Sequence, residues 1–342
     1  STSQEIDEQY GLYSVGARRR MTVIAPGVDL GRFRPPRRGE RFEVAPEIDR
    51  FLEQPKKPMI LAVQRPDERK NLSTLIRAYG ESEALRELAN LVLLIGTRDD
   101  IKEVPRGQRK ILEQMLRLID RYDLYGSVAY PKTHSPEDVP LLYRMTAASR
   151  GVFVNPALTE PFGLTLLEAS ASGVPVVATN DGGPQDILGA CENGLLVDPS
   201  DAEALGTSLL EALGDTGRWI RWAENGVRGV HANFSWEAHA RRYLSEMEKA
   251  LGGLPAEEGI RSLSRRRRLP RLDRILLTDV DDTLTGDSEA LEAFKEALDA
   301  AGTNVGFGIA TGRTLDQALE VLDELGVRTP DFLITATGTE IH

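Results

Sequence analysis

Short apolar runs alternate with amphipathic segments along most of this chain. Each run is four or five residues long and is flanked by turn residues; the runs lie at 21–24, 59–63, 91–95, 127–130, 151–154, 174–178 and 194–197. The segments between them carry apolar side chains at helical spacing, as at 71–79, 108–121 and 202–213. Short, nearly continuous apolar runs are typical of parallel strands that are buried on both faces. The pattern therefore predicts a doubly wound α/β domain.

The pattern breaks after an amphipathic helix predicted over 236–251. A polar stretch with four consecutive arginines, 265–268, follows, and a new strand–helix–strand pattern opens at Ile275. A chain of 342 residues is long enough for more than one domain. Because the chain begins at Ser1 rather than at a methionine, we expect it to be a fragment. We expect a first domain, a linker and a truncated second domain, at 21–251, 252–271 and 273–342.

The composition is typical of a globular protein in a reducing compartment. The net charge of −11 and the pI near 5.1 argue against nucleic acid as a general partner, so the four arginines are predicted to be a solvated linker. The single cysteine, Cys191, excludes an intrachain disulfide. No apolar stretch approaches the roughly 20 residues of a membrane span. We expect a cytoplasmic protein without a nucleic-acid or membrane partner, and the sequence leaves its oligomeric state open.

The most informative segment is 155–168, which follows a predicted strand and opens a predicted helix. Ligands of open α/β sheets bind at the carboxyl ends of the strands, where this segment must lie. Gly163 allows a ligand to approach the backbone closely. The unpaired amides of Leu164 and Thr165 begin the helix and are suited to a diphosphate. With Phe162, these residues are candidates for donor binding.

Two glutamates, Glu160 and Glu168, flank this turn with seven residues between them. Glu168 lies one turn into the helix, where a carboxylate can accept hydrogen bonds from both hydroxyls of a ribose. Glu160 precedes the turn and is placed to reach a sugar ring. An acidic residue near a helix start also stabilises the helix macrodipole. The spacing of the pair around a Pro-Phe-Gly turn nevertheless favours a ligand site.

A second cationic segment, 64–71, follows the predicted strand 59–63. A leaving diphosphate gathers negative charge, and cations directed at it lower the barrier. Arg65 offers a bidentate guanidinium and Lys70 a point charge. Alone, such a segment is more often a charged surface turn. Beside the glutamate pair, it favours a catalytic role for both cations.

Three further loops fall at predicted strand ends: 96–100, 130–134 and 182–184. Either of the first two could form a wall of a base pocket, with Lys132 and Thr133 as candidate contacts. His134 is more readily explained as a turn residue than as a catalytic base. The two glycines and the proline of the third loop indicate a turn into a helix and could let the backbone approach a donor sugar.

The motifs together resemble the donor-binding domain of the sucrose-phosphate synthases, retaining glycosyltransferases of the GT-B fold. The resemblance covers essentially residues 1–250, and the segments that carry it are 3–9, 26–29, 65–72, 155–168, 182–184 and 233–236. It implies a GT-B C-terminal Rossmann-like domain. It also implies that residues 1–20 are a remnant of the acceptor-side N-terminal domain.

The resemblance implies UDP-glucose as donor and fructose 6-phosphate as acceptor, with no cofactor for the transfer. It assigns Arg65 and Lys70 to the diphosphate, Glu168 to the ribose and Glu160 to the glucose, and it places loop 130–134 at the uracil. Two positions depart from the family pattern. Thr133 stands where histidine is usual and Tyr10 where tryptophan is usual.

The second domain opens with a strand that ends in an Asp-x-Asp-x-Thr motif. Asp279 can attack phosphorus, and Asp281 lies on the same face of the strand and can transfer a proton. Mg²⁺, held by both aspartates, would screen the phosphate charge. Thr283 and Thr311, the latter at the end of a second strand, are candidate phosphate-binding hydroxyls. The motifs resemble the haloacid-dehalogenase phosphatases and in particular the sucrose-phosphatases, which implies sucrose 6-phosphate as a ligand.

The sequence thus predicts a transferase that forms sucrose 6-phosphate, with two alternatives. One is a related transferase that uses another nucleotide sugar, such as GDP-mannose, with a sugar phosphate. The other is a sucrose-phosphate phosphatase or binding protein whose transferase half is structural. Phosphatase activity is not expected of the 342-residue chain alone, because the later ligands of such a site should lie beyond His342.

Overall fold

The computed structural model describes residues 22–252, 274–281, 283–301, 305–335 and 340–341. The chain divides into two compact units, residues 1–255 and 256–342. The predicted remnant 1–20 and all but the first residue of the predicted linker 252–271 lie outside the described residues.

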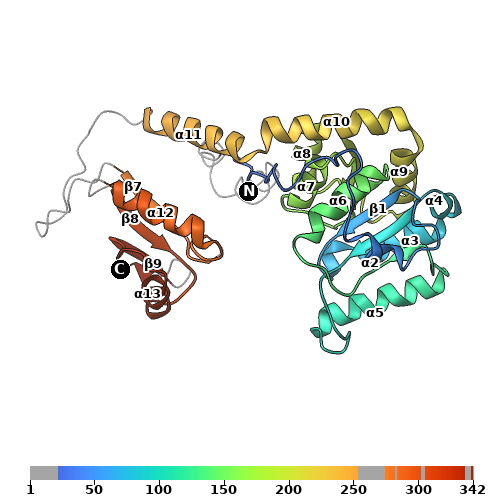
Figure 1. Cartoon of the computed structure of the whole chain (residues 1–342), viewed down its shortest axis with the longest axis horizontal. Helices are drawn as coiled ribbons and strands as arrows, with labels where there is room; N and C mark the ends of the chain where they lie inside the picture. Colours follow the sequence, from blue (N-terminus) through green and yellow to red (C-terminus); the bar gives the residue numbers. More distant parts are fainter. Residues whose placement is uncertain (1–21, 253–273, 282, 302–304, 336–339, 342) are drawn as a thin grey trace, which may run out of the picture. The chain divides into compact units, whose positions relative to one another are not determined.

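The larger unit is built on a six-stranded sheet in the order β3-β2-β1-β4-β5-β6, in which every neighbouring pair is parallel. Figure 1 shows this sheet between two layers of helices. The six apolar runs from 59 onwards are confirmed as strands, with ends shifted by one or two residues. The strands are β1 Met59–Val63, β2 Asn90–Leu94, β3 Val128–Ala129, β4 Val152–Asn155, β5 Val176–Thr179 and β6 Gly194–Val197.

The central strands are buried on both faces, as their composition requires. Met59 and Leu61 of β1 pack on one side of the sheet, and Ile60 and Ala62 pack on the other. The first side is covered by α6 Asp138–Ala148, α7 Leu164–Ala171 and α8 Gly183–Cys191. The second is covered by α3 Leu72–Glu81, α4 Glu83–Leu88, α5 Arg106–Arg121 and α9 Ala202–Gly214. The predicted doubly wound α/β architecture is confirmed.

The remaining helices of the larger unit are α2 Ala45–Asp49, α10 Thr216–Asn233 and α11 Trp236–Gly252. The predicted strand 21–24 is wrong for the described residues 22–24, which form no strand. The chain beyond them is instead held by Val28, whose amide donates to the Phe234 carbonyl at 2.8 Å. Ala25 and Val28 are buried among side chains of the first core layer. Val23 and Ile24 themselves are only half-buried, so this apolar run lacks the two-sided burial of the central strands.

The smaller unit contains a second sheet in the order β10-β9-β8-β7. The first three strands in sequence are parallel, and the fourth is antiparallel to β9. Its elements are β7 Arg274–Thr278, α12 Ser288–Ala300, β8 Val305–Ala310, α13 Leu315–Glu324, β9 Phe332–Thr335 and β10 Glu340–Ile341. Phe307 and Ile309 of β8 lie at the centre of its core. The predicted second α/β unit is therefore confirmed.

None of the described helices combines the length and the hydrophobicity that a membrane span requires.

We predict that Gly151→Ala destabilises the larger unit. A Cβ at this position, just before β4, would lie 2.1 Å from the carbonyl oxygen of Met59, so the two central strands would have to separate. We expect the free energy of unfolding to fall by about 1–3 kcal/mol. Urea titration followed by tryptophan fluorescence measures it, because all three tryptophans belong to the larger unit.

The control is Gly107→Ala in α5, where an added Cβ meets no atom within 4 Å. Alanine favours a helix over glycine, so this variant should be unchanged or more stable by up to about 1 kcal/mol. Equal midpoints for Gly151→Ala and the wild type would show that the strands can accommodate the methyl group.

Candidate functional site

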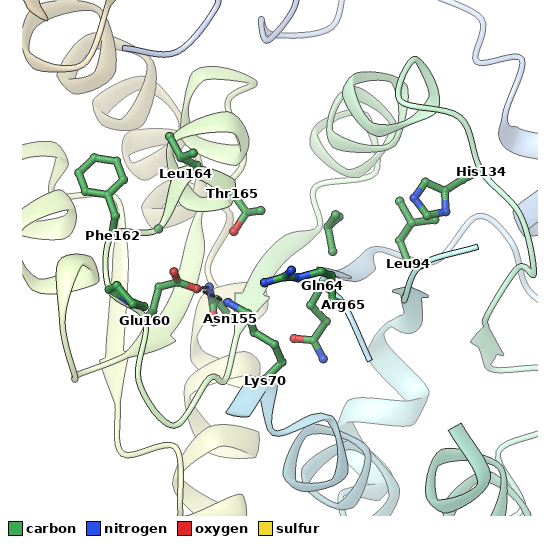
Figure 2. A pocket seen from close by; sticks show the side chains of 14 residues that line it. Gln64, Arg65, Lys70, Leu94, His134, Asn155, Glu160, Phe162, Leu164 and Thr165 are labelled. Atoms are coloured by element: carbon green, nitrogen blue, oxygen red, sulfur yellow. Dashed lines mark hydrogen bonds and ion pairs between the residues drawn. The ribbon is translucent and has the colours of Figure 1, made fainter. Parts of the chain in front are cut away.

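A cavity of about 550 Å³ opens at the carboxyl edge of the larger sheet. It lies where β1, β2 and β4 end and where α7 begins, as Figure 2 shows. The structure brings seven of the predicted donor-site residues to this cavity: Arg65, Lys70, Glu160, Phe162, Gly163, Leu164 and Thr165. The other lining residues are Val63, Gln64, Leu94, Gly96, His134, Asn155 and Pro161.

The wall formed by the start of α7 depends on Gly163. Its φ of +100° is a conformation that L side chains rarely adopt, and it turns the chain directly into the helix. The first amides of a helix have no partner within the helix. Since Leu164 and Thr165 line the cavity, this end of α7 presents its positive pole to the cavity. An anion is the chemical group that such a wall favours.

The opposite wall carries Lys70, whose ammonium lies 2.7 Å from Oε2 of Glu160. Both side chains are largely buried, with 23% of Lys70 and 12% of Glu160 exposed. Asn155 donates a second hydrogen bond to the same Oε2, at 2.9 Å. A cation and a carboxylate from segments 90 residues apart are thus joined at the cavity.

Arg65 is exposed on the same side of the cavity. Within residues 22–252 no carboxylate forms an ion pair with its guanidinium. Its positive charge is therefore available to a ligand, whereas that of Lys70 is already paired. The two predicted cations therefore differ before a ligand binds: Lys70 is paired with a carboxylate and Arg65, among the described residues, is not.

Asn71 ties the cationic loop to the rest of the site. It adopts a left-handed backbone conformation, φ 54°, between the short helix η3 Glu68–Lys70 and α3. Its Nδ2 donates to the carbonyls of Pro156, at 3.0 Å, and Pro199, at 2.6 Å. The Leu158 amide donates to the Arg69 carbonyl at 2.8 Å. The loops after β1 and β4 are therefore held together by the Asn71 side chain and by one backbone hydrogen bond.

Glu168 lies on α7 but is not among the residues that line the cavity. The Tyr143 hydroxyl, from α6, donates to its Oε2 at 3.2 Å. Burial raises the pKa of Glu168 to about 7, although the bond from Tyr143 and the charge of Arg32 act in the opposite direction. At neutral pH this carboxyl therefore exists in both protonation states.

The loop after β3 contributes less to the cavity than the sequence predicts. Lys132 and Thr133 are exposed and do not line it, whereas the adjacent His134 does. Lys132 Nζ donates to the Asp99 carbonyl at 3.1 Å. Burial lowers the pKa of His134, so its ring is predominantly neutral at pH 7. A neutral imidazole at a cavity wall is suited to hydrogen bonding or stacking rather than to charge neutralisation.

The loop 182–184 begins α8, as predicted, with Pro184 in the first helical turn. A Cβ on Gly182 would lie 2.2 Å from the Glu160 carbonyl oxygen, and the Gly183 amide donates to that oxygen at 2.9 Å. The absence of a side chain at Gly182 therefore leaves room for the Glu160 carbonyl, which the Gly183 amide binds. Asn155 was not among the predicted site residues, although its position at the end of a strand could have identified it.

The residues predicted for a phosphate site in the smaller unit follow the ends of β7 and β8: Asp279, Asp281 and Thr283 come after β7, and Thr311 comes after β8. Asp281 is held by Arg313, whose Nη2 lies 2.6 Å from Oδ1 and whose Nε lies 3.1 Å from Oδ2. This contact lowers the pKa of Asp281. Thr311 is buried at the end of β8, and Thr283 is exposed after β7. Asp279 accepts a hydrogen bond from the Val280 amide at 2.7 Å.

Mg²⁺ prefers carboxylate oxygens, which Asp279 and Asp281 could supply. However, both carboxylate oxygens of Asp281 are bound to Arg313. No group of three or more His, Cys, Asp or Glu side chains that could hold a metal occurs among the described residues. In this arrangement the residues do not fit a magnesium site.

Two family descriptions match this chain. Residues 45–228 match "Glycosyl transferases group 1", and residues 272–342 match "Sucrose-6F-phosphate phosphohydrolase". The first match contains the whole cavity, and the second contains both aspartates of the smaller unit.

Individual relatives agree with these matches. The chain is 47% identical over 283 residues to the probable sucrose-phosphate synthase 1 of Oryza sativa subsp. indica, an alignment that covers 72% of this chain and 26% of the relative. It is 42% identical over 351 residues to sucrose-phosphate synthase 4 of Arabidopsis thaliana, covering 88% of this chain and 33% of the relative. The chain thus spans about a quarter to a third of the length of these relatives.

A solved sucrose-phosphate synthase from Thermosynechococcus elongatus has a similar fold, with a TM-score of 0.54 and 29% identity over 68% of this chain and 53% of that one. The predicted GT-B donor-type domain, followed by a haloacid-dehalogenase-like unit, is thereby confirmed as the fold class. Because the first family match spans more than half of the chain, this protein belongs to the group 1 glycosyl transferases.

Proposed function

We propose that this chain is the donor-binding part of an enzyme that transfers glucose from UDP-glucose to fructose 6-phosphate, giving sucrose 6-phosphate and UDP. The observation that carries the proposal is the cavity between the amino end of α7 and the cations Arg65 and Lys70. Helix amides and cations on facing walls are suited to a diphosphate. The similarity to sucrose-phosphate synthases supports the choice of donor and acceptor.

In the proposed reaction the anomeric C–O bond to the diphosphate breaks, and a bond from the acceptor hydroxyl forms on the same face of the sugar. The departing phosphate oxygen accepts the hydroxyl proton, so the configuration is retained without a covalent sugar–enzyme intermediate. Arg65 and Lys70 stabilise the charge that grows on the diphosphate. Glu160 accepts hydrogen bonds from the glucose, and Glu168 accepts them from the ribose. The transfer requires no cofactor.

The same contacts would accept other nucleotide diphosphate sugars, such as GDP-mannose. Base preference depends on loops 96–100 and 130–134, where Lys132 and Thr133 are proposed to contact the uracil from the rim. We also propose that the protein acts in the cytoplasm, without nucleic-acid or membrane partners.

We predict that Lys70→Ala lowers the turnover of the gene product that contains this chain by about 10²–10³-fold, with a smaller effect on donor affinity. The charge on the diphosphate grows as the sugar leaves, so the lysine contributes most in the transition state. The assay follows the release of UDP from UDP-glucose or of GDP from GDP-mannose in the presence of fructose 6-phosphate, together with the disaccharide phosphate that each donor forms. The control Lys56→Ala removes an exposed lysine from the loop before β1.

The proposed donor would be wrong if GDP-mannose were the better substrate. A rise in KM alone for Lys70→Ala would show that the lysine binds the ground state only.

We predict that the affinity of the 342-residue chain for UDP-glucose rises about tenfold between pH 6 and pH 8. With its pKa raised to about 7, Glu168 is mostly protonated at pH 6 and mostly ionised at pH 8, and the ribose hydroxyls bind the ionised form. The donor diphosphate has no titration in this range. Calorimetry measures the affinity, and Glu168→Gln should bind more weakly at pH 8 with a flatter pH profile.

Stability provides a check on the same carboxyl. A carboxyl whose pKa is raised by folding stabilises the fold below its unfolded pKa, and this contribution disappears as the pH rises through about 7. Glu168→Gln should therefore be more stable than the wild type at pH 8, and the difference should shrink at pH 5. An unchanged pH profile of binding in this variant would remove Glu168 from the donor site.

A second activity is proposed for the smaller unit because of its match to sucrose-6F-phosphate phosphohydrolase. Asp279 would attack phosphorus, the P–O bond to the sugar would break, and Asp281 would donate a proton to the departing oxygen. Water would then hydrolyse the phosphorylated aspartate. Asp281 must first leave Arg313, since its oxygens are occupied. Sucrose 6-phosphate is the proposed substrate.

The described arrangement does not fit Mg²⁺, so the prediction requires that Asp281 be released from Arg313. We predict that the gene product containing this chain then releases phosphate from sucrose 6-phosphate when Mg²⁺ is added, and that Asp279→Asn abolishes the release without reducing glucosyl transfer. The control Asp299→Asn changes an exposed aspartate of α12. Phosphate release is measured colorimetrically. Absence of Mg²⁺-dependent release from the wild type would show that this unit is not a phosphatase.

A further inference from the structure

Asn155 is buried at the end of β4, with 5% of its surface exposed, and it is the last residue of the strand before the glutamate turn. Its Oδ1 accepts a hydrogen bond from the Ala157 amide at 3.2 Å. This contact fixes the orientation of the side-chain amide, so that its NH₂ group faces Glu160. The donated bond to Oε2, at 2.9 Å, follows from that orientation.

The carboxylate of Glu160 is therefore asymmetric. Oε2 accepts hydrogen bonds from both Asn155 and Lys70, whereas Oε1 has no hydrogen-bond partner among the described residues. The backbone of Glu160 is fixed independently, because its carbonyl accepts from the Gly183 amide and its amide donates to the Asp181 carbonyl at 3.3 Å. With the backbone held by α8, the side-chain direction depends on the two donors to Oε2.

Of these two donors only Asn155 is fixed. Lys70 has a flexible stem and, in the proposed reaction, must also serve the diphosphate, so it cannot hold the carboxylate throughout. A neutral amide holds a carboxylate without cancelling its charge, whereas an arginine or lysine at position 155 would cancel it.

We propose that Asn155 is a positioning residue for glucosyl transfer. It holds Glu160 so that Oε1 faces the donor sugar and Oε2 faces Lys70, and it thereby places the Lys70 charge where the diphosphate leaves. This inference rests on the proposed function and adds to it a residue that acts through Glu160 and Lys70. Asn155 itself needs no contact with the substrate.

Three variants test the proposal. Asn155→Leu keeps the approximate volume and removes the donor. Asn155→Asp keeps the shape and can donate only while protonated. Asn90→Leu is the matched control, because Asn90 is equally buried, with 1% exposed, and donates to the Gln54 carbonyl at 2.8 Å at the opposite end of the sheet.

We expect Asn155→Leu to lower kcat at least about tenfold, in line with the loss of a hydrogen bond to a charged group, with a smaller change in KM for UDP-glucose. Asn90→Leu should lower stability without lowering kcat.

The pH profile of Asn155→Asp separates positioning from packing. Two neighbouring carboxyls share one proton, so the carboxyl introduced at position 155 can donate to Glu160 at low pH and repels it once both are ionised. The turnover of this variant relative to the wild type should rise about tenfold or more as the pH falls from 8 to 5.5. Lys70, Arg65, His134 and Asp181 face or adjoin this pair and are common to both proteins. A ratio that does not change with pH would overturn the proposal, as would full kcat in folded Asn155→Leu.

A measurement without substrate tests the positioning role of Asn155 independently of the proposed function. In selectively labelled protein, the NMR chemical shifts of the Glu160 carboxyl carbon and of the Lys70 ammonium should differ from the wild type in Asn155→Leu and match it in Asn90→Leu. Unchanged chemical shifts in Asn155→Leu would overturn the inference even if the wild type transfers glucose. Changed chemical shifts in Asn155→Leu, together with a wild type that does not transfer glucose, would overturn the proposed function alone.

Discussion

All six strands of the larger unit run in the same direction, and this constraint decides where chemistry can occur. Parallel strands bring their carboxyl ends to one edge of the sheet, so the segments that follow β1 and β4 meet although 90 residues separate Lys70 from Glu160. The order of the strands places β1 and β4 side by side at the centre. The cavity, the start of α7 and the cation–carboxylate pair all follow from that adjacency. Reversing either strand would remove one wall of the site.

The site retains polar groups that do not favour folding. Glu168 is kept largely out of water beside Tyr143, which itself is fully buried, and its raised pKa shows that ionisation there is unfavourable. Arg65 remains an unpaired cation within the described residues, at the mouth of the cavity. A protein selected only for stability would replace the first with an apolar side chain. Both features are consistent with a site adapted to a polyanionic ligand with hydroxyl groups.

The sequence predicted the sheet and most of the cavity because both depend on local patterns. Apolar runs and turn residues identify strands, and strand ends identify the ligand edge. The apolar run 21–24 was wrongly predicted to be a strand: its described residues 22–24 form none, and Val23 and Ile24 are only half-buried. Side-chain partners were not predictable. The bonds between Asn155 and Glu160, and between Arg313 and Asp281, depend on rotamers and on how closely loops approach, which spacing along the chain does not determine.

The backbone contacts around Glu160 also bear on how this site can diverge. The segment from Pro156 to Gly183 is joined to η3 by Asn71 and Arg69, and to α8 through the carbonyl of Glu160, so a residue inserted there would displace several elements together. Loops 96–100 and 130–134 are less tied to this network. Insertions and exchanges in them would leave the start of α7 and the Lys70–Glu160 pair intact. Under the proposed function, a change of nucleotide base would therefore need only small steps in these loops, whereas a change of leaving group would require rebuilding the centre of the site.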